Sequence, residues 1–345
     1  MKLLALVGAS NFLGGFRYSL LTAAIALIVS WVLTPWVRNI AIAKGAVDDP
    51  NRDERRVHKE PIPKLGGLAI YAGILFSLLG VLPFAFKDKS PWMPPYLVGI
   101  LTLGAVLVVV GALDDLYAFS AKVQATLLLA VGLLVQLFGD SSARIEIQTL
   151  GIPLSDHAYI SIHPVAGALL TAAYIVVVTK TMDTIDGIDG LAAGIATISA
   201  ATLCVIATYC QQPRVAIVAA AIGGSALGFL KHNYNPAKIF MGTGGAYVLG
   251  FMLACLSIVG ALKTAAAVSL LIPVTVFGVP IFDAFFVIAR RIYHREPITQ
   301  ADKRHLHHTL LKRGLSQRQA VLVLYVAAMT LCGAILYAVV NLKHA

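Results

Sequence analysis

The sequence predicts an all-α polytopic integral membrane protein that crosses the bilayer about ten times. Of its 345 residues, 58% are hydrophobic and only 13% are charged. A soluble domain carries about 25% charged residues, so a large soluble core is a poor alternative. Because backbone polar groups find no partner in lipid, each apolar segment is expected to be an α-helix.

Ten apolar segments are long enough to cross the bilayer, which takes about 20 helical residues. They span residues 19–37, 66–86, 95–113, 123–138, 164–180, 191–209, 215–231, 244–262, 265–289 and 319–340. Small residues such as those between Gly223 and Gly228 permit close helix packing. We expect one integral membrane domain over residues 1–345, without internal repeats.

The ninth segment is too long for one straight crossing. From Ala265 to Glu296 it runs 32 residues, and Pro273 and Pro280 interrupt it. Because proline breaks or kinks a helix, we expect a broken ninth helix whose second half leans into the membrane interface. Charged residues lie in or beside that half: Asp283, Arg290 and Arg291.

Charged residues distinguish the two ends of the predicted bundle. Of the 27 Lys and Arg residues, 19 follow the odd-numbered segments. Cytoplasmic loops are rich in Lys and Arg, so this end is expected to be cytoplasmic and both termini to lie outside. Of the 17 acidic residues, 13 lie at the same end. Acidic residues contribute little to topology, so their accumulation indicates a functional site.

Carboxylates concentrate where the fifth segment gives way to the sixth. Asp183, Asp186 and Asp189 are spaced by three residues, which on a helix places them along one face. Gly187 and Gly190 permit a tight loop and close approach of the backbone to a ligand. Such a loop suits Mg²⁺, which prefers oxygen ligands and keeps substrate phosphates in its shell. A purely structural loop is the alternative.

A second acidic pair, Asp114 and Asp115, ends the third segment. One carboxylate can bind a cation or act as a base, while the other orients this first carboxylate. The pair alone is equally compatible with an interfacial cap on a loop.

Two basic stretches at the same end are candidates for anion binding. One stretch holds three histidines among Lys and Arg residues: His305, His307 and His308. This basic surrounding fits recognition of a pyrophosphate or a sugar better than zinc binding. A surface cluster without a role is the alternative. In the loop after the first segment, His58 and Lys64 precede a glycine pair. Phosphate contact is the functional interpretation of that loop, and membrane anchoring by positive charge is the alternative.

Together these residues resemble the polyprenyl-phosphate N-acetylhexosamine-1-phosphate transferase family, whose members include bacterial undecaprenyl-phosphate GlcNAc-1-phosphate transferases and phospho-MurNAc-pentapeptide translocase. The likeness runs from about residue 57 to residue 314, and the order and spacing of its short blocks are highly specific. The HxHH block is similar to the GlcNAc-1-phosphate branch. The blocks are His58…Pro63-Lys64…Gly66-Gly67, Asp114-Asp115…Ser120…Lys122, Asp186-Gly-Ile-Asp189-Gly-Leu191, Phe240-Met-Gly242…Gly245, and Pro280-Ile-Phe-Asp283…Arg290-Arg291 with Asp302-Lys-Arg-His305-Leu-His307-His308.

The resemblance implies that a lipid phosphate attacks the β-phosphorus of a UDP-sugar, that UMP leaves, and that a lipid-pyrophosphate-sugar forms. It implies an N-acetylhexosamine as the sugar, GlcNAc or a modified relative of it, with the GlcNAc branch favoured. It also implies undecaprenyl phosphate as the acceptor and a role in starting cell-envelope polysaccharide synthesis at the bacterial inner membrane. It also implies a Mg²⁺ requirement, with Mn²⁺ as an alternative ion. No nucleic-acid partner is expected, and a homodimer is left open.

The resemblance assigns roles to matching positions in cytoplasmic loops near residues 38–65, 114–122, 181–190, 232–243 and 290–318. Asp114 would engage or deprotonate the lipid phosphate, and Asp115 would support it. Asp186 and Asp189 would shape the uridine and metal side. The histidines would meet the pyrophosphate and sugar. The remaining substrate-binding candidates are His58, Lys64, Lys122, Gly187, Gly190, Asp283, Arg290 and Arg291.

Four positions depart from the family's pattern. Asn is usual where this chain has Lys180 and Asp183, and a basic residue is frequent where it has Gln124. A metal-binding Asp is usual at Thr243. We expect that the carboxylate has moved, so that Asp183 supplies the charge that Thr243 lacks and holds the metal with Asp186.

Two other functions are compatible with the sequence. The lost Asp suggests an altered family member that binds a lipid phosphate or a nucleotide sugar without catalysis. An ion-coupled transporter is the other alternative, but transporters place charged residues near the bilayer midplane, in broken helices of paired repeats. Here the acidic residues gather at one membrane edge.

Overall fold

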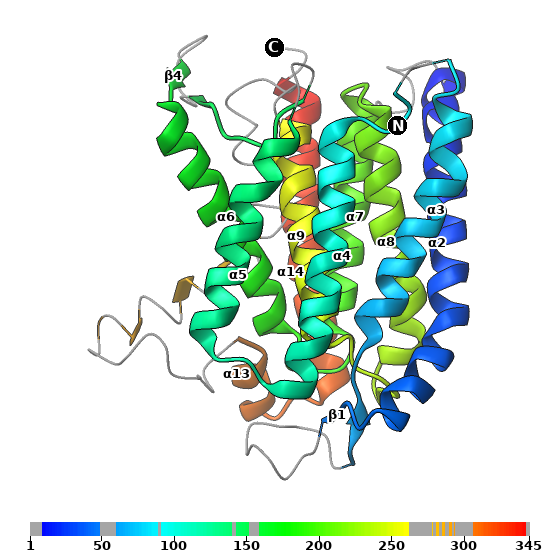
Figure 1. The fold of residues 1–345 in the computed structure, drawn as a ribbon, viewed down its shortest axis with the longest axis vertical. Coiled ribbons are helices and arrows are strands. Elements are labelled where there is room, and N and C mark those ends of the chain that lie inside the picture. Colours follow the sequence, from blue (N-terminus) through cyan, green and yellow to red (C-terminus); the bar gives the residue numbers. More distant parts are fainter. Residues whose placement is uncertain are drawn as a thin grey trace.

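A computed structural model describes residues 9–48, 60–88, 91–139, 143–151, 159–261 and 306–342, together with single positions between 278 and 293. These parts form an elongated bundle of long helices (Figure 1). Within them, nine helices are long and apolar enough to span a membrane. The prediction of an all-α polytopic membrane protein is therefore confirmed. The predicted ninth segment and its break lie largely outside the described residues.

The bundle begins with α2 (Ala9–Ala43), α3 (Gly66–Ala85), α4 (Pro95–Tyr117) and α5 (Ala121–Leu134), which continues as the 3-10 helix η2 (Val135–Phe138). It continues with α6 (Pro164–Ile185), α7 (Leu191–Tyr209), α8 (Pro213–Asn233) and α9 (Gly242–Ala261). The short α13 (Leu306–Lys312) precedes α14 (Gln317–Leu342). Proline starts α4, α6 and α8, where its missing N–H costs nothing.

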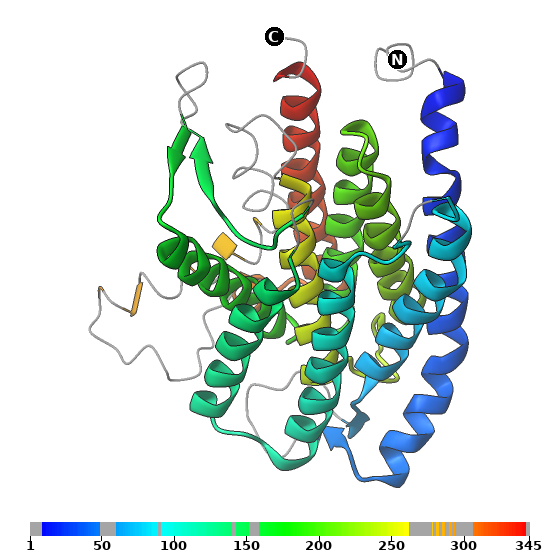
Figure 2. The ribbon, with the colours of Figure 1, turned by 45° about the horizontal axis from the view of Figure 1, so that its top comes forward.

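Two small antiparallel hairpins flank the bundle. At the lower end in Figure 1, β1 (Val47–Asp48) pairs with β2 (Ile62–Pro63). At the opposite end, β3 (Thr149–Gly151) pairs with β4 (Tyr159–Ser161), and Figure 2 shows this hairpin projecting beyond α5 and α6.

Helix α9 forms the centre of the bundle, and nearly all of its membrane-spanning length is buried. It contacts α3, α4, α6, α7 and α8. Glycines make this packing close. A Cβ at Gly67 of α3 would collide with the backbone of Gly245, and a Cβ at Gly111 of α4 would collide with the backbone of Gly244. On the outside of the bundle, large apolar side chains such as Phe84 are exposed, as expected of a surface that faces lipid.

The helices continue further than the apolar pattern predicts at the lower end of the bundle. α4 runs to Tyr117 and α6 to Ile185, so Asp114, Asp115 and Asp183 lie in last helical turns rather than in the predicted loops. Polar residues can occupy these turns because the site described below gives their side chains partners. The same end carries β1 and α13 (Figure 1).

Candidate active site at one end of the bundle

Lys64 joins the start of α3 to the end of α4. Its ammonium Nζ lies 2.8 Å from Asp48 Oδ1 and 3.8 Å from Asp115 Oδ1. The backbone holds this lysine in place, because Lys64 N donates to Ala46 O at 2.8 Å directly after the β1–β2 pair. A positive charge thus lies between two carboxylates that are far apart in the sequence.

Asp115 caps the N-terminus of α9. Both of its carboxylate oxygens accept from Thr243 N, at 3.2 and 3.1 Å, and Thr243 Oγ1 donates to Oδ1 at 3.4 Å. The first N–H groups of a helix lack intrahelical partners and carry partial positive charge, so a buried carboxylate is stabilised there. Gly242 has a φ of +70°, and a Cβ at this position would collide with the Asp115 carboxylate. Glycine is therefore required next to Asp115.

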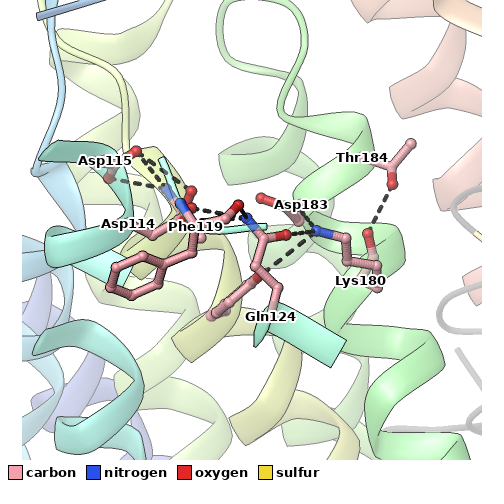
Figure 3. Close-up of polar contacts among 9 residues, drawn as sticks. Asp114, Asp115, Phe119, Gln124, Lys180, Asp183 and Thr184 are labelled. Atoms are coloured by element: carbon pink, nitrogen blue, oxygen red, sulfur yellow. Dashed lines mark hydrogen bonds and ion pairs between the residues drawn. The ribbon is translucent and has the colours of Figure 1, made fainter. Parts of the chain in front are cut away.

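Asp114 closes the turn between α4 and α5. Its Oδ1 accepts from Phe119 N at 2.8 Å and from Gln124 Nε2 at 3.0 Å, and its Oδ2 lies 3.1 Å from the same Nε2 (Figure 3). The side chain is buried. Two neutral donors therefore orient this carboxylate from one side.

Lys180 stands between α5, α6 and α9. Its Nζ donates to Asp183 Oδ2 and to Gln124 Oε1, both at 2.7 Å, and lies 3.4 Å from Tyr247 Oη (Figure 3). It also lies 5.5 Å from the centroid of the Tyr247 ring, within the range of a cation–π contact. A continuous chain of polar contacts therefore runs from Asp183 through Lys180 and Gln124 to Asp114.

Asp186 follows the end of α6 at Ile185 and is only partly exposed. Burial raises the pKa of the Asp186 carboxyl well above its usual value, and the charges of Asp183 and Asp115 raise it further, while Lys64 opposes them. A carboxyl group whose ionisation is opposed by its neighbours is stabilised in its charged form by an added cation.

The acidic side chains outnumber the lysines that compensate them, which bears on the predicted metal. Within the described parts of the chain, no three His, Cys, Asp or Glu side chains are placed to hold a metal ion by themselves. Mg²⁺ is commonly bound by one or two carboxylates together with substrate phosphates. The carboxylate oxygens of the described residues are ligands of the kind that Mg²⁺ prefers, but they do not form a cage of protein ligands by themselves. The carboxylates concerned are Asp114, Asp115, Asp183 and Asp186, facing Lys64 and Lys180.

Asp189 lies apart from the predicted line of carboxylates. Because α6 ends at Ile185, the spacing of three residues does not continue along a helix face. Instead, Asp189 Oδ2 accepts from Asn235 Nδ2 and from Ala237 N, both at 2.9 Å. In the structure this buried carboxylate anchors the loop between α8 and α9.

The glycines and basic residues predicted to bind substrate are placed as follows. Gly190 has a φ of +80° and donates its N–H to Asn233 Oδ1 at 3.1 Å, and Gly187 is exposed in the same turn. Lys122 is exposed in the first turn of α5. Arg290 is exposed and Arg291 is buried.

Five candidates fall where the structure gives no side-chain placement. His58, Asp283 and His305 lie outside the described residues. His307 and His308 belong to α13, which lies at the same end of the bundle as the carboxylates (Figure 1), but their side chains are outside the description.

Sequence reasoning missed Asp48 and Tyr247 as parts of this site. Tyr247 is four residues after Thr243 on α9, so its hydroxyl shares a helix face with a position already suspected. That spacing was a usable signal. Asp48 had none, because its contact with Lys64 depends on how two distant segments pair.

A membrane bundle with lysines and buried carboxylates at one end is typical of membrane proteins that bind charged ligands at the bilayer surface. Comparison with known proteins then identifies the family. Residues 97–261 match Glycosyl transferase family 4, and this chain belongs to that family. The predicted resemblance is thus confirmed.

Curated relatives match most of the chain. A protein of Bacillus subtilis named "Probable undecaprenyl-phosphate N-acetylglucosaminyl 1-phosphate transferase" is 36% identical over 305 residues, covering 87% of this chain and 79% of its own length. A decaprenyl-phosphate N-acetylglucosaminephosphotransferase of Mycolicibacterium smegmatis is 33% identical, over 87% of this chain and 77% of its own. An undecaprenyl-phosphate alpha-N-acetylglucosaminyl 1-phosphate transferase of Escherichia coli K12 is 28% identical, covering 91% of this chain and 83% of its own length.

Proposed function

We propose that this protein transfers GlcNAc-1-phosphate from UDP-GlcNAc to undecaprenyl phosphate, releasing UMP, and so starts a cell-envelope polysaccharide. One observation carries the proposal. Lys64, Asp115 and the chain from Asp114 to Asp183 converge at one end of a membrane bundle, in a family whose named relatives act on polyprenyl phosphates.

The reaction would exchange one phosphoanhydride (P–O–P) bond for another. An oxygen of the lipid phosphate bonds to the β-phosphorus of the nucleotide sugar, and the bond from that phosphorus to the bridging oxygen breaks, so that UMP leaves. Phosphoryl-type transfer requires mainly positioning and charge stabilisation. Asp114 would accept a proton from, or orient, the lipid phosphate. Lys64 would lie against the phosphates of the nucleotide.

The charges of the site explain why a cation would be needed. A diphosphate that approaches the ionised carboxylates of the site is repelled by them, and the two lysines already have carboxylate partners. Asp183 and Asp186 would hold Mg²⁺, or Mn²⁺ in its place. When bound, this ion would neutralise the diphosphate and stabilise the leaving UMP.

We also infer that the site faces the cytoplasm of a bacterial inner membrane. This rests on the excess of Lys and Arg at the end of the bundle that holds Lys64 and Lys180.

An assay with purified protein in detergent tests the function. The protein would receive undecaprenyl phosphate and one of a panel of UDP-sugars, with Mg²⁺ or with a chelator. We expect one UMP for each lipid-linked sugar, with UDP-GlcNAc as the best donor and no product under chelation. Asp114→Asn is the inactive control. Turnover that is independent of divalent ions, or a different donor, would contradict the corresponding part of the proposal.

A binding protein without turnover is a second candidate, favoured by the hydrogen bonds at Thr243. That residue holds Asp115 and offers no carboxylate of its own. The same assay separates the two functions. If UDP-GlcNAc binds in calorimetry but no UMP appears with any lipid phosphate, the binding function replaces the transferase.

A further inference from the structure

Lys180 is a lysine in the last turns of a membrane-spanning helix whose role the proposed reaction leaves open. It lies in α6, one turn before the helix ends, and its ammonium meets partners from three helices: Gln124 on α5, Asp183 on α6 and Tyr247 on α9. The question is what its position does for the reacting groups.

The donors and acceptors along the chain permit only one arrangement. An ammonium has three donors and no acceptor, so Gln124 must turn its Oε1 toward Lys180. The amide Nε2 then faces Asp114, whose ionised carboxylate can only accept. If the amide were reversed, donors would face the lysine and an acceptor would face the carboxylate. Lys180 therefore fixes the orientation of Gln124.

The orientation of Gln124 in turn determines which oxygen of Asp114 is available. Oδ1 accepts from both Phe119 N and Gln124 Nε2, at 2.8 and 3.0 Å. Among the described residues Oδ2 has the single, longer contact with Gln124, at 3.1 Å. Oδ2 is thus the oxygen with acceptor capacity left for a proton or for a ligand.

We infer that Lys180 is a positioning residue for the transfer reaction: through Gln124 it directs Oδ2 of Asp114 toward the lipid phosphate. This inference rests on the proposed function. Tyr247 restrains the third side of the ammonium, because its hydroxyl and its ring both face Nζ. Gln124 hydrogen-bonds both the Lys180 ammonium and Asp114. A lysine at position 124 could therefore donate to Asp114 directly and take over the role of Lys180.

The experiment compares Lys180→Met, Lys180→Arg and the double variant Lys180→Met with Gln124→Lys. We would measure kcat, and KM for UDP-GlcNAc, under saturating lipid phosphate. A general base contributes about 10²–10⁴-fold to a rate, and we expect the loss of its orientation to lower kcat by about 10–100-fold in Lys180→Met, with little change in KM. The double variant should recover most of this loss. Lys231→Met is the matched control, since Lys231 is exposed at the same end of the bundle.

The outcomes separate the inference from the function on which it rests. If the wild-type protein releases no UMP, the proposed function fails. If the wild type is active, an unchanged kcat in Lys180→Met, or a loss that neither arginine nor the moved lysine relieves, overturns the inference. Should Lys180→Met not fold, Gln124→Glu replaces it. That variant keeps an acceptor for Lys180 but sets a carboxylate against Asp114, and an unaltered kcat there would equally overturn the inference.

Discussion

Asp115, at the end of α4, accepts the backbone N–H of Thr243 at the start of α9, so the C-terminus of one helix caps the N-terminus of another. The two residues are 128 positions apart in the sequence. Because Lys64 approaches the same carboxylate, the entry to α3 is tied to this contact as well. The site is therefore built on the junction of three helix ends.

The first prediction concerns the glycine that this junction requires. We expect Gly242→Ala to lower thermal stability and to abolish transfer, because the new methyl group meets the Asp115 carboxylate at a φ of +70°. Gly45→Ala is the matched control, since Gly45 has a φ of +69° but a methyl group there would have no atom within 4 Å. The left-handed conformation alone costs about 1–2 kcal/mol. Equal melting temperatures for the two variants in detergent would show that the collision is unimportant.

Much of this fold could be predicted because membrane spans are local features of the sequence. The segments 66–86 and 191–209 agree with α3 and α7 within a residue or so, since apolar length decides both ends. The ends of α4 and α6 could not be predicted in the same way. Asp114 and Asp183 resemble loop residues until their partners on other helices are known.

The site was predictable as a set of acidic residues but not as a network. The spacing of three residues predicted that Asp189 lies beside Asp186 on one helix face. Because α6 ends before both residues, the Asp189 carboxylate instead contacts Asn235. The link from Asp114 to Lys180 runs through Gln124, which the sequence marked only as a departure from the family's pattern and not as a partner of either residue. Such contacts depend on the packing of helices that no local pattern specifies.

A second prediction tests the close packing of α3 on α9. We expect Gly67→Ala to prevent stable folding, because the methyl group would collide with the backbone of Gly245, which cannot move aside as a side chain could. Gly80→Ala, in the same helix, should leave stability unchanged or raise it by up to about 1 kcal/mol, since alanine favours helix and the methyl group has open space. Yield and melting temperature in detergent measure both. Similar behaviour of the two variants would argue against this packing.

A third prediction concerns the exchange of a carboxylate between two positions. If Asp183 supplies the metal-binding charge that Thr243 lacks, Asp183→Asn should lower the rate of UMP release and raise the Mg²⁺ concentration for half-maximal rate. We expect this Mg²⁺ concentration to rise at least about tenfold, since the loss of even an outer-sphere partner lowers metal affinity or activity by about 10–100-fold. Adding Thr243→Asp to Asp183→Asn should restore the Mg²⁺ response. The hypothesis that the carboxylate has moved is wrong if Asp183→Asn leaves turnover and its Mg²⁺ dependence intact.

The last prediction follows from the protonation of Asp186. Its folded-state pKa is raised by burial and by the charges of Asp183 and Asp115, whereas an unfolded Asp titrates near about 3.9. Between these two values the folded protein holds a proton that the unfolded chain releases, so stability falls as pH rises. In the presence of a chelator, the melting temperature should therefore decline from about pH 4 upward through the raised pKa, and Asp186→Asn should reduce the slope. Mg²⁺ should offset the decline, because a cation favours the ionised carboxylate and displaces the proton. An identical slope for Asp186→Asn would show that this carboxyl group is ionised in the folded protein without a metal.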